Sequence, residues 1–173
     1  MLSAAGQVWV IDPVEGDGVD ERIRALGEPA GVLVLLDRHR RDSDAFAERL
    51  GVPVHETPFD GVPGSPFEFR RILRSRFWRE VALWWPERLV LVAADVLGSV
   101  AYFGEPLGLH PLLRVRPPRR ALAGLAPEHV LVGHGEGVHG PEAAPALEHA
   151  LATARTGVPR LVADGLRRAV RRS

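Results

Sequence analysis

The chain has no cysteine, no lysine and no asparagine among its 173 residues. Without cysteine, neither a disulfide framework nor a cysteine-ligated zinc site can form, and nothing argues for an oxidising compartment. All 22 basic residues are arginine, and 22 acidic residues balance them. This balance removes the simple electrostatic case for a nucleic acid or an acidic membrane as partner.

Long apolar runs are missing as well. No apolar stretch approaches the roughly 20 residues needed to cross a bilayer, and residues 1–7 lack the basic and apolar regions of a signal peptide. We therefore expect a cytoplasmic protein without membrane contact. The length suits a single domain over residues 1–173, and 46% hydrophobic with 25% charged residues is typical of a globular protein.

Short apolar runs that alternate with charged or glycine-rich segments predict an α/β chain. We expect strands at residues 8–13, 31–36, 52–54, 80–85, 89–94 and 129–132. We expect helices at residues 19–26, 45–50, 119–124, 141–156 and 162–171. Residues 86–88 are expected to join their two flanking strands as a hairpin, whereas residues 67–76 carry no clear pattern.

Polar side chains follow predicted strands at three places, where α/β proteins usually bind ligands. These places are the charged segment 37–44, the Ala94-Asp95 step and the Gly133-His134-Gly135 turn. Each place also has a plain structural explanation. Asp42, Ser43 or Asp44 suits a helix N-cap, and Asp95 suits a turn. A dinucleotide-binding fingerprint fits poorly, because Pro141 rather than the glycine turn opens the following helix.

The order of these pieces resembles the metallo-β-lactamase superfamily from about Val8 to Leu151. The Ile11-Asp12-Pro13 step matches an early strand of the family, Ala94-Asp95 matches its Gly-Asp step, and Gly133-His134-Gly135 matches its late Gly-His-Gly turn. The resemblance implies an αββα sandwich, with two sheets packed face to face and helices outside. We expect the sandwich to be trimmed at its N-terminus, because Ile11-Asp12-Pro13 arrives without the hairpin that precedes it in the family.

The first metal motif of the family, His-x-His-x-Asp-His, is almost entirely replaced. Arg38, Arg40, Asp42 and Ser43 stand where His, His, Asp and His belong. His39 falls on a spacer position and is expected to point elsewhere. The family's next histidine has no counterpart in residues 74–79, and His55 comes too early to replace it.

Asp42, Asp95 and His134 are the ligand positions that remain, and in the family they help to hold the second metal. One imidazole and two carboxylates form a legitimate shell for zinc, iron or manganese, and a bound metal would activate a water. Arg38 and Arg40 beside a cation oppose that metal directly. We therefore expect no cofactor, with one divalent metal as the alternative.

Arg38 and Arg40 suggest a second role for the same position. Their guanidiniums are expected to pair with Asp42 and Asp95 and to replace the charge of the cation. A donor left over would bind a carboxylate or phosphate, whereas the plainer alternative is that these arginines only neutralise neighbouring aspartates. His39, His110 and His139 are accessory candidates, with a surface role favoured for the last two.

Three functions follow from this resemblance. The favoured one is a family member that has lost hydrolysis and binds a small molecule or a protein. The second is a hydrolase that uses one metal on a small ester or thioester. The third is a nucleic-acid-associated protein that uses the arginine-rich segment 167–172. The balanced charge disfavours this third function.

Overall fold

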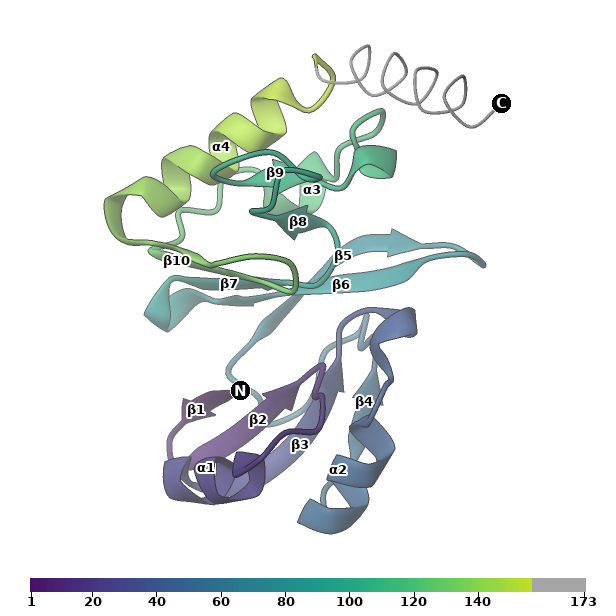
Figure 1. Cartoon of the computed structure of the whole chain (residues 1–173), viewed down its shortest axis with the longest axis vertical. Coiled ribbons are helices and arrows are strands. Elements are labelled where there is room, and N and C mark those ends of the chain that lie inside the picture. The colour runs from purple at the N-terminus through teal and green to yellow at the C-terminus, as the bar shows by residue number, and fades with distance from the viewer. Residues whose placement is uncertain (157–173) are drawn as a thin grey trace. The chain divides into compact units, whose positions relative to one another are not determined.

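The computed structural model of the chain describes residues 1–156 (Figure 1). It divides into two compact units, of which the first spans Met1–Pro86 and the second begins at Glu87. The helix expected at residues 162–171 and the arginines of segment 167–172 lie outside the described residues. In the described part, no helix is long and apolar enough to cross a membrane. The compartment and the single domain over residues 1–173 stay predictions.

The first unit contains a four-stranded sheet in the order β1-β2-β3-β4 (Figure 1). The strands are β1 (Leu2–Ala4), β2 (Gln7–Ile11), β3 (Glu28–Val34) and β4 (Val54–Glu56). β1 pairs antiparallel with β2, whereas β2, β3 and β4 run parallel. The two parallel connections contain α1 (Val19–Leu26) and α2 (Ser43–Leu50), as expected of βαβ units.

The core of this sheet is built from apolar positions that the sequence spaces for strands and helices. Val8, Val10 and Val32 come from the strands, and Ile23, Phe46 and Ala47 come from the helices. Ile23 and Phe46 are fully buried. Each helix thus turns one apolar stripe to the sheet, which fixes the segments that follow β2 and β3.

β5 (Glu68–Arg74) and β6 (Arg79–Trp85) form an antiparallel hairpin in the first unit. β6 is almost wholly buried, and Val81 donates a backbone hydrogen bond of 2.9 Å to Leu35. The register shifts between Arg71 and Leu73, so Ile72 is an extra residue that forms a β-bulge. A bulge breaks the period-two alternation, and this explains why residues 67–76 showed no clear pattern.

The second unit contains β7 (Val90–Ala93), β10 (His129–Val132) and β11 (Val138–His139) in one sheet. β7 and β10 run parallel, and β11 is antiparallel to β10. β8 (Leu97–Gly98) and β9 (Gly108–Leu109) form a separate ribbon. The helices are α3 (Arg119–Leu122) and α4 (Ala143–Thr153), and α4 buries Leu147 and Leu151.

Short 3₁₀ turns complete the described elements. They are η1 (Asp37–His39), η2 (Pro86–Arg88), η3 (Pro111–Leu113) and η4 (Gly140–Glu142). Residues 86–88, predicted to join two strands as a hairpin, form η2 between β6 and β7. The predicted strand 129–132 and helix 19–26 are confirmed by β10 and α1. The helix predicted from Pro141 begins with η4 and continues as α4.

The expected αββα sandwich is wrong. The described residues form short mixed sheets with few helices, and not two long sheets that each carry a layer of helices. The order of strands and helices along the chain could be predicted from the sequence. The number of strands that pair into each sheet could not.

The expected loss of an N-terminal hairpin is also wrong, because β1 and β2 form a hairpin before Asp12. Its turn residues Ala5 and Gly6 have φ values of 50° and 79°. Positive φ at both positions is the type I′ geometry that Asn-Gly usually signals. A chain without asparagine hides that signal, and β1 itself is too short to show an alternation.

Candidate functional site

Asp12, at the end of β2, organises the edge of the first sheet. Its Oδ1 accepts a 2.8 Å hydrogen bond from the backbone N–H of Leu35. Its Oδ2 lies 3.1 Å from Nδ1 of His39 in η1. His39 is only 7% exposed, so this residue turns inward although its motif position is a spacer. Asp12 therefore ties three segments together, a role that the Ile-Asp-Pro pattern did not reveal.

Arg40 forms a bidentate ion pair with Asp44, with two nitrogen–oxygen distances of 2.8 Å. Its third nitrogen donates to Glu56 of β4 at 2.6 Å. The hydrogen bonds with Asp44 raise the pKa of Arg40, and Arg40 in turn lowers the pKa of Asp44 through the same bonds. All three guanidinium nitrogens of Arg40 thus donate to carboxylates of its own unit.

Arg38 and Asp42 are engaged by their surroundings, whereas the Ser43 hydroxyl, within the described residues, is not. The guanidinium of Arg38 lies 4.6 Å from the ring centre of Trp78 and donates to the carbonyl of Phe77 at 3.4 Å. Oδ2 of Asp42 accepts the backbone N–H of Glu15 at 2.9 Å. Ser43 is fully buried as the first residue of α2, and its Oγ has no hydrogen-bond partner among the described residues.

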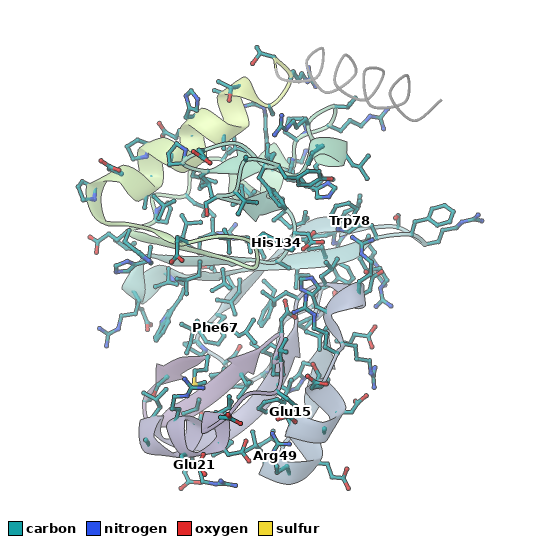
Figure 2. All side chains as sticks on the ribbon, viewed as in Figure 1. Glu15, Glu21, Arg49, Phe67, Trp78 and His134 are labelled. Carbon is teal, nitrogen blue, oxygen red and sulfur yellow. The ribbon has the colours of Figure 1, made fainter. Side chains whose placement is uncertain are left out.

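Asp95 and His134 come together in the second unit. Each follows one of the parallel strands β7 and β10, whose register places Ala93 beside Val132. Nε2 of His134 lies 3.2 Å from Oδ1 of Asp95. The Asp95 side chain is 16% exposed and the His134 side chain 47%. The imidazole of His134, which is labelled in Figure 2, is therefore accessible.

Gly135 holds the turn that presents His134. Its φ is +94°, and a Cβ there would lie 2.3 Å from Oγ of Ser99. Ser99 also donates its backbone N–H to the carbonyl of His134 at 3.0 Å and its hydroxyl to Glu136 at 2.6 Å. Glycine is required here for both backbone conformation and close approach.

The other two accessory histidines, His110 and His139, lie in different places. His110 and His134 both contact the ring of Phe103, with centroid distances of 5.7 Å and 5.5 Å. Nδ1 of His110 also accepts the backbone N–H of Leu112. His139 instead faces His129 across β10 and β11, with 3.1 Å between their Nδ1 atoms.

The candidate ligands Asp42, Asp95 and His134 do not form a shell that fits a metal ion. Within residues 1–156, no group of three or more His, Asp or Glu side chains could hold one. Asp95 and His134 supply two donors, whereas catalytic zinc usually has three protein ligands. Asp42 binds a backbone N–H instead.

The pKa of His55 is lowered by burial. A lowered pKa means that the unfolded chain binds a proton before the folded chain does, so stability is lost as pH falls below the unfolded value of about 6.5. We expect the unfolding midpoint of the protein to fall more steeply between pH 7 and pH 5 than that of His55→Gln. Parallel curves for the two proteins would contradict this assignment.

No protein-family model and no curated protein matches the chain. Its fold is similar to the crystal structure of the DIM-1 metallo-β-lactamase exposed to ceftazidime. The TM-score is 0.58 at 14% sequence identity, and the match covers 89% of this chain and 82% of that one. The apo chemotaxis sensor ODP from T. denticola aligns over 86% of this chain and 83% of its own, with 14% identity and a TM-score of 0.46.

The fold is thus similar to that of a metallo-β-lactamase, which is the coarser part of the resemblance seen in the sequence. At 14% sequence identity, the similarity is evidence for the fold alone. A shared fold does not transfer an activity, because sites change independently of the scaffold that carries them.

Proposed function

We propose that this protein is a strongly diverged, non-catalytic member of the metallo-β-lactamase fold that acts as a binding module. The observation that carries the proposal is that the guanidinium of Arg40 is hydrogen-bonded to both Asp44 and Glu56. Arg40 stands where the family's second histidine ligand belongs. A guanidinium has no lone pair to offer a metal, and this one already binds two carboxylates.

The other positions of the motif support the same proposal. Ser43 replaces a ligand with a short, buried hydroxyl, and the Asp42 carboxylate is engaged with the chain near α1. Among residues 1–156, neither Ser43 nor Asp42 belongs to a group of three or more side chains that could hold a metal ion. The residues of the former motif therefore serve the stability of the first unit.

A hydrolase remains the second candidate, and the contact between Asp95 and His134 favours it. These two residues retain the types that the family uses at the Gly-Asp step and the Gly-His-Gly turn. In this alternative, the protein uses one metal for attack on a small ester or thioester.

Metal content separates the two candidates. We expect less than about 0.1 equivalent of zinc, iron or manganese per chain after each metal is supplied in turn, because a shell of three protein ligands is the minimum for tight binding. Elemental analysis of untagged protein measures this value. About one equivalent that disappears in His134→Ala would contradict the proposal and restore the hydrolase.

A matched variant makes a negative result informative. Arg38→His, Arg40→His and Ser43→His together rebuild the His-x-His-x-Asp-His pattern on this scaffold. Metal uptake by this triple variant, with none by the natural sequence, would show that the residues at these three positions prevent metal binding.

A further inference from the structure

The β5–β6 hairpin concentrates positive charge in a chain whose charges otherwise balance. Residues 68–79 contain five arginines and one glutamate, a net charge of five minus one, or +4. Arg70 pairs with Glu68 at 2.6 Å, and Arg79 lies 3.9 Å from Glu56. Arg71, Arg74 and Arg76 are exposed, and the ion pairs among residues 1–156 include none of these three arginines. A surplus of charge is therefore left on the hairpin surface.

The bulge at Ile72 gathers these arginines on one face. In a regular strand, residues three apart point to opposite faces. The extra residue changes that parity, so Arg71 pairs with Val81 and Arg74 pairs with Arg79 on the same side of the ribbon. The guanidiniums of Arg71, Arg74 and Arg79 accordingly surround one ring, that of Phe59, at 5.8, 5.0 and 5.9 Å from its centre.

This arrangement is costly for the fold alone. Arg74 and Arg79 stand directly opposite each other, and like charges at such positions destabilise a sheet. The π face of Phe59 offsets part of that repulsion. A bound anion would offset the rest, and the planar guanidinium is the side chain best suited to hold a phosphate through two hydrogen bonds.

Phe77 adds an aromatic platform beside the charges. It is 72% exposed in the turn between β5 and β6, and the guanidinium of Arg76 lies 4.2 Å from its ring centre. The turn is built by Ser75, whose Oγ accepts the backbone N–H groups of Phe77 and Trp78 at 3.2 and 3.1 Å. Trp78, also on the hairpin, is buried and donates to Glu80 (Figure 2). The fold thus buries one aromatic ring and leaves its neighbour in solvent.

We propose that this surface binds single-stranded nucleic acid. We define the surface by Phe59, Arg71, Arg74, Arg76, Phe77 and Arg79. Phosphates would lie on the arginines while an unpaired base stacks on Phe77, the combination of charge and aromatic stacking that single-strand binders use. A duplex hides its base faces and is a poorer fit. The motif positions touch this surface, since Arg38 donates to the Phe77 carbonyl and Arg40 shares Glu56 with Arg79. Single-strand binding needs only the exposed side chains of the surface, so the metal measurement and this one have separate readouts.

Fluorescence anisotropy with a labelled single-stranded 12-mer, as RNA and as DNA, tests the proposal on the full chain. We expect the logarithm of the binding constant to fall linearly with the logarithm of salt concentration, with a slope of about −2 for three phosphates. Arg71→Glu with Arg74→Glu should weaken binding by about tenfold or more and flatten the slope. Arg116→Glu with Arg120→Glu makes the same charge change at exposed arginines outside the hairpin and should leave binding within about threefold.

Phe77→Ala tests the stacking separately and changes an exposed side chain, so folding is not at stake. We expect it to weaken single-strand binding by about 5- to 100-fold without altering the salt slope. Equal losses in the two charge-reversal variants would overturn the proposal. So would absence of binding at low salt, or binding to a duplex, to heparin or to phosphatidylserine vesicles as tight as to the single strand.

Discussion

Asp12→Ala is expected to lower the free energy of unfolding by about 3 kcal/mol. The change removes the acceptor of the Leu35 N–H and the partner of His39. An unsatisfied backbone donor costs about 1–3 kcal/mol, and the second hydrogen bond adds about 1 kcal/mol. Asp12 also has a φ of 43°, a conformation that alanine adopts less readily than aspartate. Urea unfolding followed by tryptophan fluorescence measures the difference.

Asp12→Asn is the matched control for this prediction. Asparagine keeps an oxygen for Leu35 and tolerates a positive φ, so its cost should be nearer 1 kcal/mol. A loss in Asp12→Ala no larger than that in Asp12→Asn would show that the contacts with Leu35 and His39 do not hold this edge together.

Gly135→Ala is expected to destabilise the second unit by about 2–4 kcal/mol and to displace His134. A Cβ at residue 135 would lie 2.3 Å from Oγ of Ser99 and 3.0 Å from Val100. The positive φ alone costs about 1–2 kcal/mol for a residue with a side chain. The steric conflict adds to this value because Ser99 is held by its bond to Glu136. Thermal unfolding and the NMR shift of His134 report the two effects.

Gly124→Ala separates the backbone cost from the conflict, because Gly124 has a φ of +81° and open space around its Cβ position. It should cost only about 1 kcal/mol. Adding Ser99→Ala to Gly135→Ala should recover part of the stability, since it removes the hydroxyl that the new Cβ meets. Equal effects of Gly124→Ala and Gly135→Ala would contradict the close approach.

The sequence predicted most strands and helices because their apolar positions follow the period of each element. It also singled out Asp95 and His134, which follow predicted strands and match the Gly-Asp step and the Gly-His-Gly turn of the family. Their 3.2 Å contact follows from the register of β7 and β10. The parallel pairing of these two strands, which brings the side chains together, was not predicted from the sequence.

The partners of His39 and Arg40 could not be predicted in the same way. His39 reaches Asp12 over 27 positions and Arg40 reaches Glu56 over 16, and no spacing rule links residues so far apart. Motif alignment placed Arg40 on a metal-ligand position and His39 on a spacer position, whereas their contacts depend on where η1 and β4 lie. Side-chain pairing at such distances requires the tertiary structure.

The balance of charge over the whole chain was a poor guide to its surface. The total of 22 against 22 says nothing of how the charges are arranged. Arg71 and Arg74 share a face only because Ile72 bulges, and a regular alternation would have separated them. The hairpin was thus the segment that sequence patterns described least well.

The cations around Phe59 are permanent because guanidinium groups stay protonated at any pH at which the protein remains folded. A proton cannot switch this surface off, and acetylation has no lysine to modify anywhere in the chain. Dissolved ions screen it instead, over about 8 Å at physiological ionic strength. Its affinity for an anion should therefore depend on the salt concentration of the solution and not on its pH.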